Sequence, residues 1–150
     1  KNLFHIKSAS LLDGEFIWSV RNHKTSRIWF DGKKIELKDH LKWFKKEYLN
    51  ANSHFFIGMS GTERVGYLRF SMIEDKHPVI SYGVTSSLRK RGYGMIILKM
   101  GTAHFFRTHP DINKVIASAH KQNIPSIKSF RRAGFNESEG DKHFHFELSR

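Results

Sequence analysis

The sequence predicts an α/β fold in which helices cover a mixed β-sheet. Two observations lead to this prediction. Segments of alternating apolar and polar residues are interleaved with segments whose apolar residues recur every three or four positions. A strand, a helix and a second strand follow one another over residues 79–119, and such a unit places two parallel strands in one sheet. At 150 residues, we expect one compact domain, residues 1–150.

The first half of the chain predicts a strand, two helices and a hairpin. The helices are expected where apolar residues lie at helical spacing, and the second of them carries lysines between its apolar positions. The hairpin is expected where two alternating segments flank the Ser60-Gly61 turn. In order, these elements are a strand at 3–8, helices at 13–22 and 37–49, and strands at 54–59 and 65–73.

The second half predicts a strand, a long helix, a strand, a short helix and a final strand. Gly134 ends the short helix, as a left-handed cap requires. The last segment, H-F-H-F-E-L, places two phenylalanines on one face of a strand. In order, these elements span residues 79–84, 94–107, 115–119, 126–133 and 143–148.

Composition narrows the function classes. The net charge of +12 favours a partner rich in phosphate, either a nucleotide or RNA. No RNA-binding signature is present, so a nucleic-acid partner is not expected. The chain has no cysteine and no apolar run of about 20 residues, so we expect a cytoplasmic protein with no membrane partner. Its ten histidines lack the H-x-x-x-H spacing of a helical zinc site, and no metal is expected.

A glycine-bearing loop is the most informative stretch. Arg89-x-x-Gly92-x-Gly94 follows a predicted strand and opens a predicted helix. Unpaired N–H groups at a helix start attract an anion, glycines let the backbone approach it, and arginines add positive charge. Neither G-x-G-x-x-G nor G-x-x-x-x-G-K-[ST] is present. The loop therefore predicts a pyrophosphate-binding site for a cofactor.

Two motifs together resemble the GNAT superfamily of N-acyltransferases. The glycine loop after Val84 is similar to the acyl-CoA signature of that family, and the Asn123-x-x-Ser126-x-x-x-Phe130-x-x-Ala133-Gly134-Phe135 segment is similar to its later motif. The resemblance implies a central mixed, mostly antiparallel sheet that splays between two strands and is flanked by helices. It also implies acetyl-CoA as co-substrate.

The resemblance assigns cofactor roles to the matching positions. The backbone of the strand end would hold the pantetheine arm, and the loop would wrap the pyrophosphate. Asn123 would contact the pantetheine or hold the slot open, and it would also serve as the N-cap of the helix at Ser126. The expected cofactor-binding residues are Gly83, Val84, Arg89, Lys90, Arg91, Gly92, Tyr93, Gly94, Asn123 and Ser126.

The first half resembles a subgroup of the same superfamily. The pattern is Trp18-x-x-Arg21-Asn22-His23, then Arg27, Ile35, His40 and Trp43-Phe44. That subgroup includes ribosomal-protein N-terminal acetyltransferases and amino-sugar N-acetyltransferases that act on nucleotide-linked sugars. The resemblance implies that Arg21, Arg27 and His40 hold an anionic acceptor. The alternative is that Arg21 and Asn22 cap a helix and that the aromatic pair is core.

Proton transfer has candidate residues at the expected slot. His120 and Glu74 are the candidate bases, each with a structural alternative as an exposed residue at a strand end. The general acid is harder to assign, because many family members carry a tyrosine where this chain has Phe130. Tyr82, Ser126, Ser129 or Tyr93 would substitute, or the thiolate, whose pKa is about 8.5, would leave unaided. We expect Tyr82 to be catalytic, with a buried core tyrosine as the alternative.

The predicted function is acetyl-CoA-dependent transfer of an acetyl group to a primary amine. The favoured acceptor is a small-molecule amine, a nucleotide-linked amino sugar. The alternatives are a protein N-terminal amine and a catalytically silent module that binds acyl-CoA or nucleic acid. We expect a monomer or a homodimer.

Overall fold

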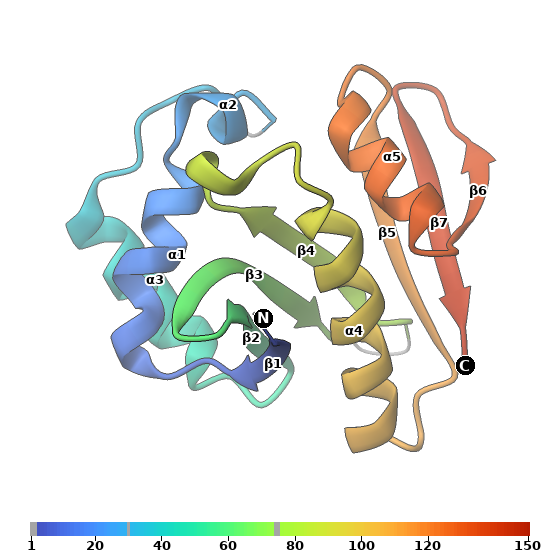
Figure 1. Ribbon diagram of the computed structural model, residues 1–150, viewed down its shortest axis with the longest axis horizontal. Helices are drawn as coiled ribbons and strands as arrows, with labels where there is room; N and C mark the ends of the chain where they lie inside the picture. Colours follow the sequence, from blue (N-terminus) through green and yellow to red (C-terminus); the bar gives the residue numbers. More distant parts are fainter. Residues whose placement is uncertain (1–2, 30, 74–75) are drawn as a thin grey trace.

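The computed structural model describes residues 3–29, 31–73 and 76–150. Within them, seven strands form one sheet in the order β1-β2-β3-β4-β5-β7-β6 (Figure 1). Neighbouring strands are antiparallel except β4 and β5, which are parallel. The strands are β1 (Phe4–Ser8), β2 (Ser53–Ser60), β3 (Glu63–Ser71), β4 (Val79–Val84), β5 (Lys114–His120), β6 (Asn136–Glu139) and β7 (His143–Ser149). The predicted mixed, mostly antiparallel sheet is confirmed.

The helices agree with the predicted ones in place and differ by a few residues at their ends. The helical segments are η1 (Leu11–Asp13), α1 (Gly14–Arg21), α2 (Lys24–Arg27), α3 (Leu37–Tyr48), η2 (Ser86–Leu88), α4 (Tyr93–Thr108) and α5 (Ile124–Arg132). Neither α2 nor β6 was predicted, for the same reason. Both are four residues long and polar, K-T-S-R and N-E-S-E, so neither offers an apolar period.

Two apolar cores lie on the two faces of the sheet. One contains α4 and α5 side chains, including Leu98, Phe105 and Phe130, packed with Leu68 and Phe70 of β3. The other contains Ile17 of α1 and Phe44 of α3, packed with Phe55, Ile57 and Tyr67. Successive strand residues point to opposite faces, so β3 supplies both cores. This arrangement gives the sheet one face toward α4 and another toward α1 and α3 (Figure 1).

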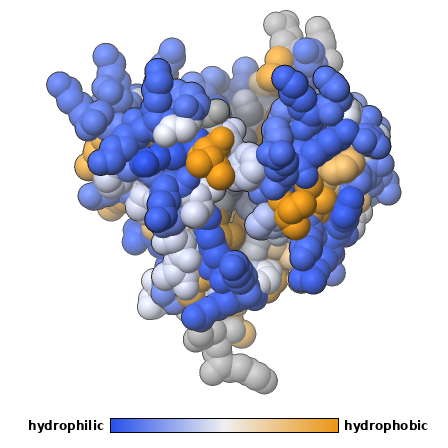
Figure 2. All heavy atoms as spheres, turned by 90° about the horizontal axis from the view of Figure 1, so that it is seen from above, coloured by the Kyte–Doolittle hydropathy of each residue, from blue (hydrophilic) through white to orange (hydrophobic). Residues whose placement is uncertain are grey.

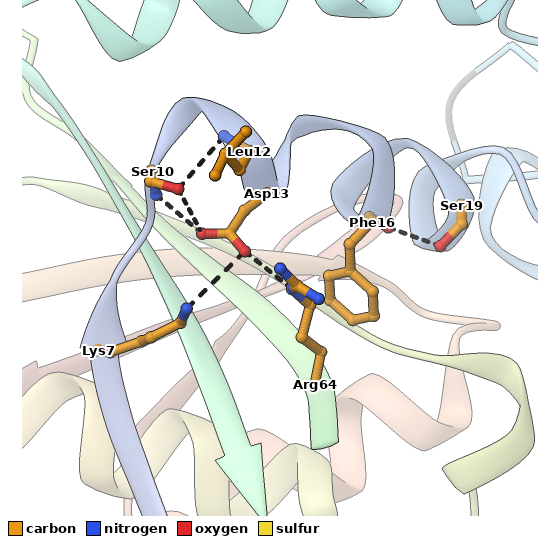
Figure 3. Close-up of polar contacts among 7 residues, drawn as sticks. All are labelled: Lys7, Ser10, Leu12, Asp13, Phe16, Ser19 and Arg64. Carbon is orange, nitrogen blue, oxygen red and sulfur yellow. Dashed lines mark hydrogen bonds and ion pairs between the residues drawn. The ribbon is translucent and has the colours of Figure 1, made fainter. Parts of the chain in front are cut away.

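A buried carboxylate anchors the start of α1 to the sheet. Asp13 has no exposed surface, and its carboxylate accepts hydrogen bonds from the Ser10 N–H at 2.8 Å and from Arg64 Nε at 2.8 Å (Figure 3). Lys7 Nζ lies 4.0 Å away. Burial alone raises the pKa of Asp13, but the Ser10 N–H, the Arg64 hydrogen bond and the two cations lower it overall. The ion pair therefore holds α1 against β3, which positions the residues at the far end of α1.

No helix in the described part of the chain has the length and apolarity needed to cross a bilayer. The same residues contain no cluster of three or more His, Cys, Asp or Glu side chains suited to a metal ion.

Candidate cofactor and acceptor site

The parallel strands β4 and β5 diverge from a single point of contact. In the described residues they share one register pair, Val79 with Ile116, and the Ile116 N–H donates to the Pro78 carbonyl at 2.9 Å. Toward their carboxyl ends the two strands separate, which confirms the predicted splay (Figure 1). Figure 2, seen from the top of Figure 1, shows a hollow on this face with hydrophilic side chains on both sides. Among the described residues, the facing edges of β4 and β5 make no further strand pairing beyond this point.

The glycine loop joins β4 to the N-terminus of α4. Lys90 and Gly92 have positive φ, 64° and 82°, and α4 begins at Tyr93 directly after them. No side chain caps this helix start. The N–H groups of the first turn have no partner within the helix, and the helix dipole adds positive potential there. The loop therefore offers an anion site beside the slot, as the sequence predicts.

The Arg89 side chain points into the protein instead of into this loop. Its Nε donates to the Val84 carbonyl at 3.2 Å, and its Nη2 donates to Ser26 Oγ at 2.5 Å. Its Nη1 donates to Thr25 Oγ1. Arg89 thus ties the end of β4 to α2. The exposed basic side chains of the loop are Lys90 and Arg91.

Tyr82 packs beside Phe130 and has the hydroxyl that the Phe130 ring lacks. The two rings meet edge to face, 5.6 Å between centroids, and the Tyr82 hydroxyl donates to Ser126 Oγ at 3.1 Å. Burial raises the pKa of Tyr82, and contacts with Ser126, Ser129 and Arg89 only partly oppose it. The phenol therefore stays protonated and able to donate.

Asn123 acts as the N-cap of α5, since its side chain accepts from the Ser126 N–H at 3.4 Å. This is the structural role expected for it. Through Ser126, the same cap positions the partner of Tyr82.

His120 lies at the end of β5 between two rings. Its centroid is 5.6 Å from Trp29 and 5.4 Å from His143. Its Nδ1 accepts from the Gln122 N–H at 3.1 Å, which assigns the proton of the neutral ring to Nε2. A role as base stays a prediction, and it requires Nδ1 to release that amide. Glu74, the other predicted base, lies outside the described residues.

The predicted acceptor residues occupy three different environments. Arg21 lines a small pocket on the α1 and α3 face of the sheet, and its guanidinium lies 4.3 Å over the Trp43 ring. His40 is buried behind it, with Nδ1 3.1 Å from Arg21 Nη1 and Nε2 2.9 Å from the Gly14 carbonyl. Arg27 does not line this pocket, and its Nη1 donates to the Asn22 carbonyl at 3.3 Å.

Two residues of the acceptor-side motif act as a clamp. Trp18 Nε1 donates to the Ile35 carbonyl at 2.7 Å, and Asn22 Oδ1 accepts from the Ile35 N–H at 2.7 Å. Both polar backbone groups of Ile35 are thereby attached to α1 and its C-cap. The clamp fixes the segment between α1 and α3, and it accounts for the spacing of these residues in the sequence.

The family follows from comparison with known proteins. A family model described as the acetyltransferase (GNAT) domain matches residues 7–136. The chain belongs to the GNAT acetyltransferase family. It is an acetyl-CoA-dependent N-acetyltransferase of that type, with acetyl-CoA as co-substrate. The splayed strands and the uncapped start of α4 fit the elongated, phosphate-bearing co-substrate.

Curated relatives and solved structures agree with this family. The acetyltransferase PseH of Campylobacter jejuni is 23% identical over 145 residues, 97% of this chain and 88% of the relative. The crystal structure of C. jejuni PseH with acetyl coenzyme A has a TM-score of 0.73 at 18% identity and covers 99% of each chain. Spermidine N-acetyltransferase from Vibrio cholerae, solved with CoA and spermine, has a TM-score of 0.82 at 10% identity and covers 97% of this chain and 95% of that one.

The sequence did not predict that strand residues line the pocket on the α1 and α3 face. Tyr67 and Arg69 of β3 and Ser81 of β4 line the pocket together with Arg21 and Trp43. Register brings them together, since Arg69 pairs with Ser81 and Tyr67 pairs with Gly83. The period of two places Tyr67 and Arg69 on one face of the strand, but nothing local shows that α1 covers this face.

Proposed function

We propose that this enzyme transfers the acetyl group of acetyl-CoA to the primary amine of a nucleotide-linked amino sugar. The observation that carries the proposal is the acceptor-side pocket, which presents the guanidinium groups of Arg21 and Arg69. Similarity to PseH over nearly the whole chain supports the same acceptor class. The net charge of +12 supports an anionic acceptor.

The geometry supports a definite place for acetyl-CoA. Its pyrophosphate would bind the N–H groups at the start of α4, with Lys90 and Arg91 supplying charge from the loop. Its pantetheine arm would lie along the Gly83 and Val84 backbone, where β4 has separated from β5. The thioester would then lie in the slot, between Tyr82 and the end of β5.

The proposed chemistry is a direct transfer between amine and thioester. The neutral amine attacks the thioester carbonyl, and backbone N–H groups stabilise the oxyanion that forms. The C–N bond forms, the C–S bond breaks, and the amine loses one proton to water or a base. The thiolate takes a proton from the Tyr82 hydroxyl, which lies 3.1 Å from Ser126 Oγ, and the phenolate regains a proton from solvent. No covalent enzyme intermediate is needed, and the chain has no cysteine to form one.

The pocket argues against a polycationic acceptor. The V. cholerae relative was solved with spermine, which carries several positive charges at neutral pH. In this chain an acceptor that enters the pocket would meet the guanidinium of Arg21 at the Trp43 ring. Like charges close together are unfavourable, whereas the phosphates of a nucleotide would be attracted.

Thiol release from acetyl-CoA, corrected for hydrolysis, tests the proposal. The panel would contain a UDP-linked amino sugar, the same amino sugar without its nucleotide, peptides that begin with Ala or Ser, and spermine. We expect the highest kcat/KM with the UDP-linked sugar. Equal or faster acetylation of the peptides or of spermine would overturn the acceptor class. Tight acetyl-CoA binding with no acceptor turned over would overturn the catalytic proposal and leave the cofactor site.

A further inference from the structure

The pocket on the α1 and α3 face is lined by side chains that donate hydrogen bonds. Of the residues that the structure describes, five line it, namely Arg21, Trp43, Tyr67, Arg69 and Ser81. They come from α1, α3, β3 and β4, so the pocket exists only in the folded chain. Its polar side chains are two guanidinium groups, a phenol, an alcohol and an indole N–H. No carboxylate of the described residues lines it.

Tyr67 points an unpartnered hydroxyl into this pocket. The residue is 5% exposed, and within the described part of the chain its hydroxyl makes no hydrogen bond. The hydroxyl is therefore available to hydrogen-bond a group that enters the pocket. Burial raises the pKa of Tyr67, more than the nearby Arg21 and Arg69 lower it, so the phenol is a donor at neutral pH. The group it needs is a hydrogen-bond acceptor.

The two guanidinium groups meet at one aromatic ring. Arg21 lies 4.3 Å and Arg69 5.2 Å from the centroid of Trp43. Two guanidinium groups this close to a shared ring favour an anion, although the Glu47 carboxylate balances much of the charge of Arg69.

Arg69 is fixed from behind and keeps one amino group for the pocket. Its Nε donates to Ser53 Oγ at 3.0 Å, and its Nη2 donates to Glu47 Oε1 at 2.5 Å. Among the described residues, its Nη1 has no hydrogen-bond partner. Glu47 thus orients the guanidinium without lining the pocket.

We propose that this pocket is a subsite for a carboxylate or phosphate group of the acceptor, held by Arg21, Arg69 and the Tyr67 hydroxyl. The inference rests on the proposed function, because it takes the acceptor to enter from the face that α1 and α3 cover. It goes further by naming the residues that would select for an anion. Bidentate contact with a guanidinium suits both oxyanions.

The subsite and the strand end proposed to hold the pantetheine arm lie close together on β4. Ser81 faces the pocket, and Gly83 faces the same side, where a Cβ would lie 2.9 Å from the Tyr67 ring. Tyr82, between them, faces α5. Same-face residues of a strand are about 7 Å apart, so the subsite lies about that far along β4 from Gly83.

Tyr67→Phe is the variant that tests the subsite with least damage. It removes one hydroxyl and keeps the ring, and Tyr48→Phe on α3 is the matched control. The acceptors are one amino sugar in three forms: neutral, phosphorylated, and carrying a carboxylate. We expect Tyr67→Phe to raise KM about tenfold for the charged form that the pocket takes and to leave the neutral form unchanged. An unchanged ratio between charged and neutral forms would overturn the proposal.

A binding measurement separates the subsite from the reaction. With CoA saturating, so that the α4 site is filled, inorganic phosphate and acetate are titrated separately while the Trp43 indole N–H is followed by NMR. We expect a saturable shift with one or both anions, weakened about tenfold in Tyr67→Phe and further in Arg69→Gln. No shift, or a shift that both variants retain, would overturn the subsite. A subsite that binds in a protein that acetylates no amine would support this inference and refute the proposed function.

Discussion

The proposed cofactor side and the proposed acceptor side of this enzyme are built from different groups. The cofactor side uses backbone: two separating strand ends, a loop with positive φ at Lys90 and Gly92, and an uncapped helix start. The acceptor side uses side chains from separate elements, such as Arg21, Trp43 and Tyr67, gathered on one face of the sheet. A backbone site binds what all acyl-CoA substrates share, whereas a side-chain site can change its specificity through single substitutions.

Arg89 joins the two sides. It belongs to the glycine loop in sequence, but its guanidinium binds the Val84 carbonyl on one side and the hydroxyls of Thr25 and Ser26 on the other. Because α2 contains Arg27, one of the predicted acceptor residues, a change at Arg89 should affect both sides. The comparison can therefore be tested with variants that affect one side, the other or both.

The largest effect is expected where the two sides meet, at Tyr82. Tyr82→Phe removes the hydroxyl that Ser126 orients, and general acid catalysis contributes at least about 100-fold. We expect kcat to fall about 100-fold while the Kd of acetyl-CoA is unchanged. Tyr48→Phe is the comparison variant, since that ring packs against the core between α3 and the sheet. A loss of less than about fivefold in Tyr82→Phe would show that the thiolate leaves unaided.

A fall in pH should destabilise the protein through His40, on the acceptor side. Burial, followed by the charge of Arg21, lowers the pKa of His40 to about 4, although the Gly14 hydrogen bond opposes this. An unfolded histidine has a pKa near 6.5, so between these values the unfolded chain binds a proton that the folded chain does not. The free energy of unfolding should therefore fall as pH drops from about 6.5 to about 4, by about 2 kcal/mol after solvent screening.

Urea denaturation at several pH values in this window measures the effect. His40→Gln should show a smaller loss on acidification than the wild type, because glutamine does not titrate. The exposed His77 provides the control, His77→Gln. An equal slope in wild type and His40→Gln would refute the assignment.

Substitution of two matched glycines tests the glycine loop separately from general backbone strain. Gly92 and Gly32 have similar positive φ, 82° and 77°, and a Cβ at either would meet no heavy atom within 4 Å. A valine at each position therefore imposes similar backbone strain, about 1 to 2 kcal/mol. We expect Gly92→Val to weaken acetyl-CoA binding about tenfold and Gly32→Val to leave it unchanged, as measured by calorimetry. Similar losses in both would show that general strain, and not the loop, sets the affinity.

The smallest effect is expected at Arg89, and it should appear on both sides. Arg89→Gln should raise the KM of acetyl-CoA and of the acceptor about fivefold each, because it releases β4 from α2. Arg91→Gln, which removes an exposed charge from the same loop, should change only the acetyl-CoA constant. The paired change Thr25→Val and Ser26→Ala should reproduce the acceptor effect alone. An acceptor KM unchanged in both Arg89→Gln and this pair would refute the link.

Local patterns predicted most of the fold. The alternating and helical segments placed β4, α4 and α5 close to their observed bounds, and Gly134 ends α5 with a φ of 92° as expected. The loop at Gly92 and the cap at Asn123 were also predicted, since each depends on neighbours within a few residues. Segments without an apolar period, α2 and β6, were missed because only their packing and pairing define them.

The order of motifs in residues 79–135 was therefore enough to indicate the family. A strand, a glycine loop and a capped helix are each specified by short-range chemistry. The tertiary structure decided three other features. These are the direction of the Arg89 side chain, the packing of Tyr82 beside Phe130, and the approach of Arg21 and Arg69 to one ring. Strand register and helix placement bring these side chains together across the sheet, and no local pattern contains that information.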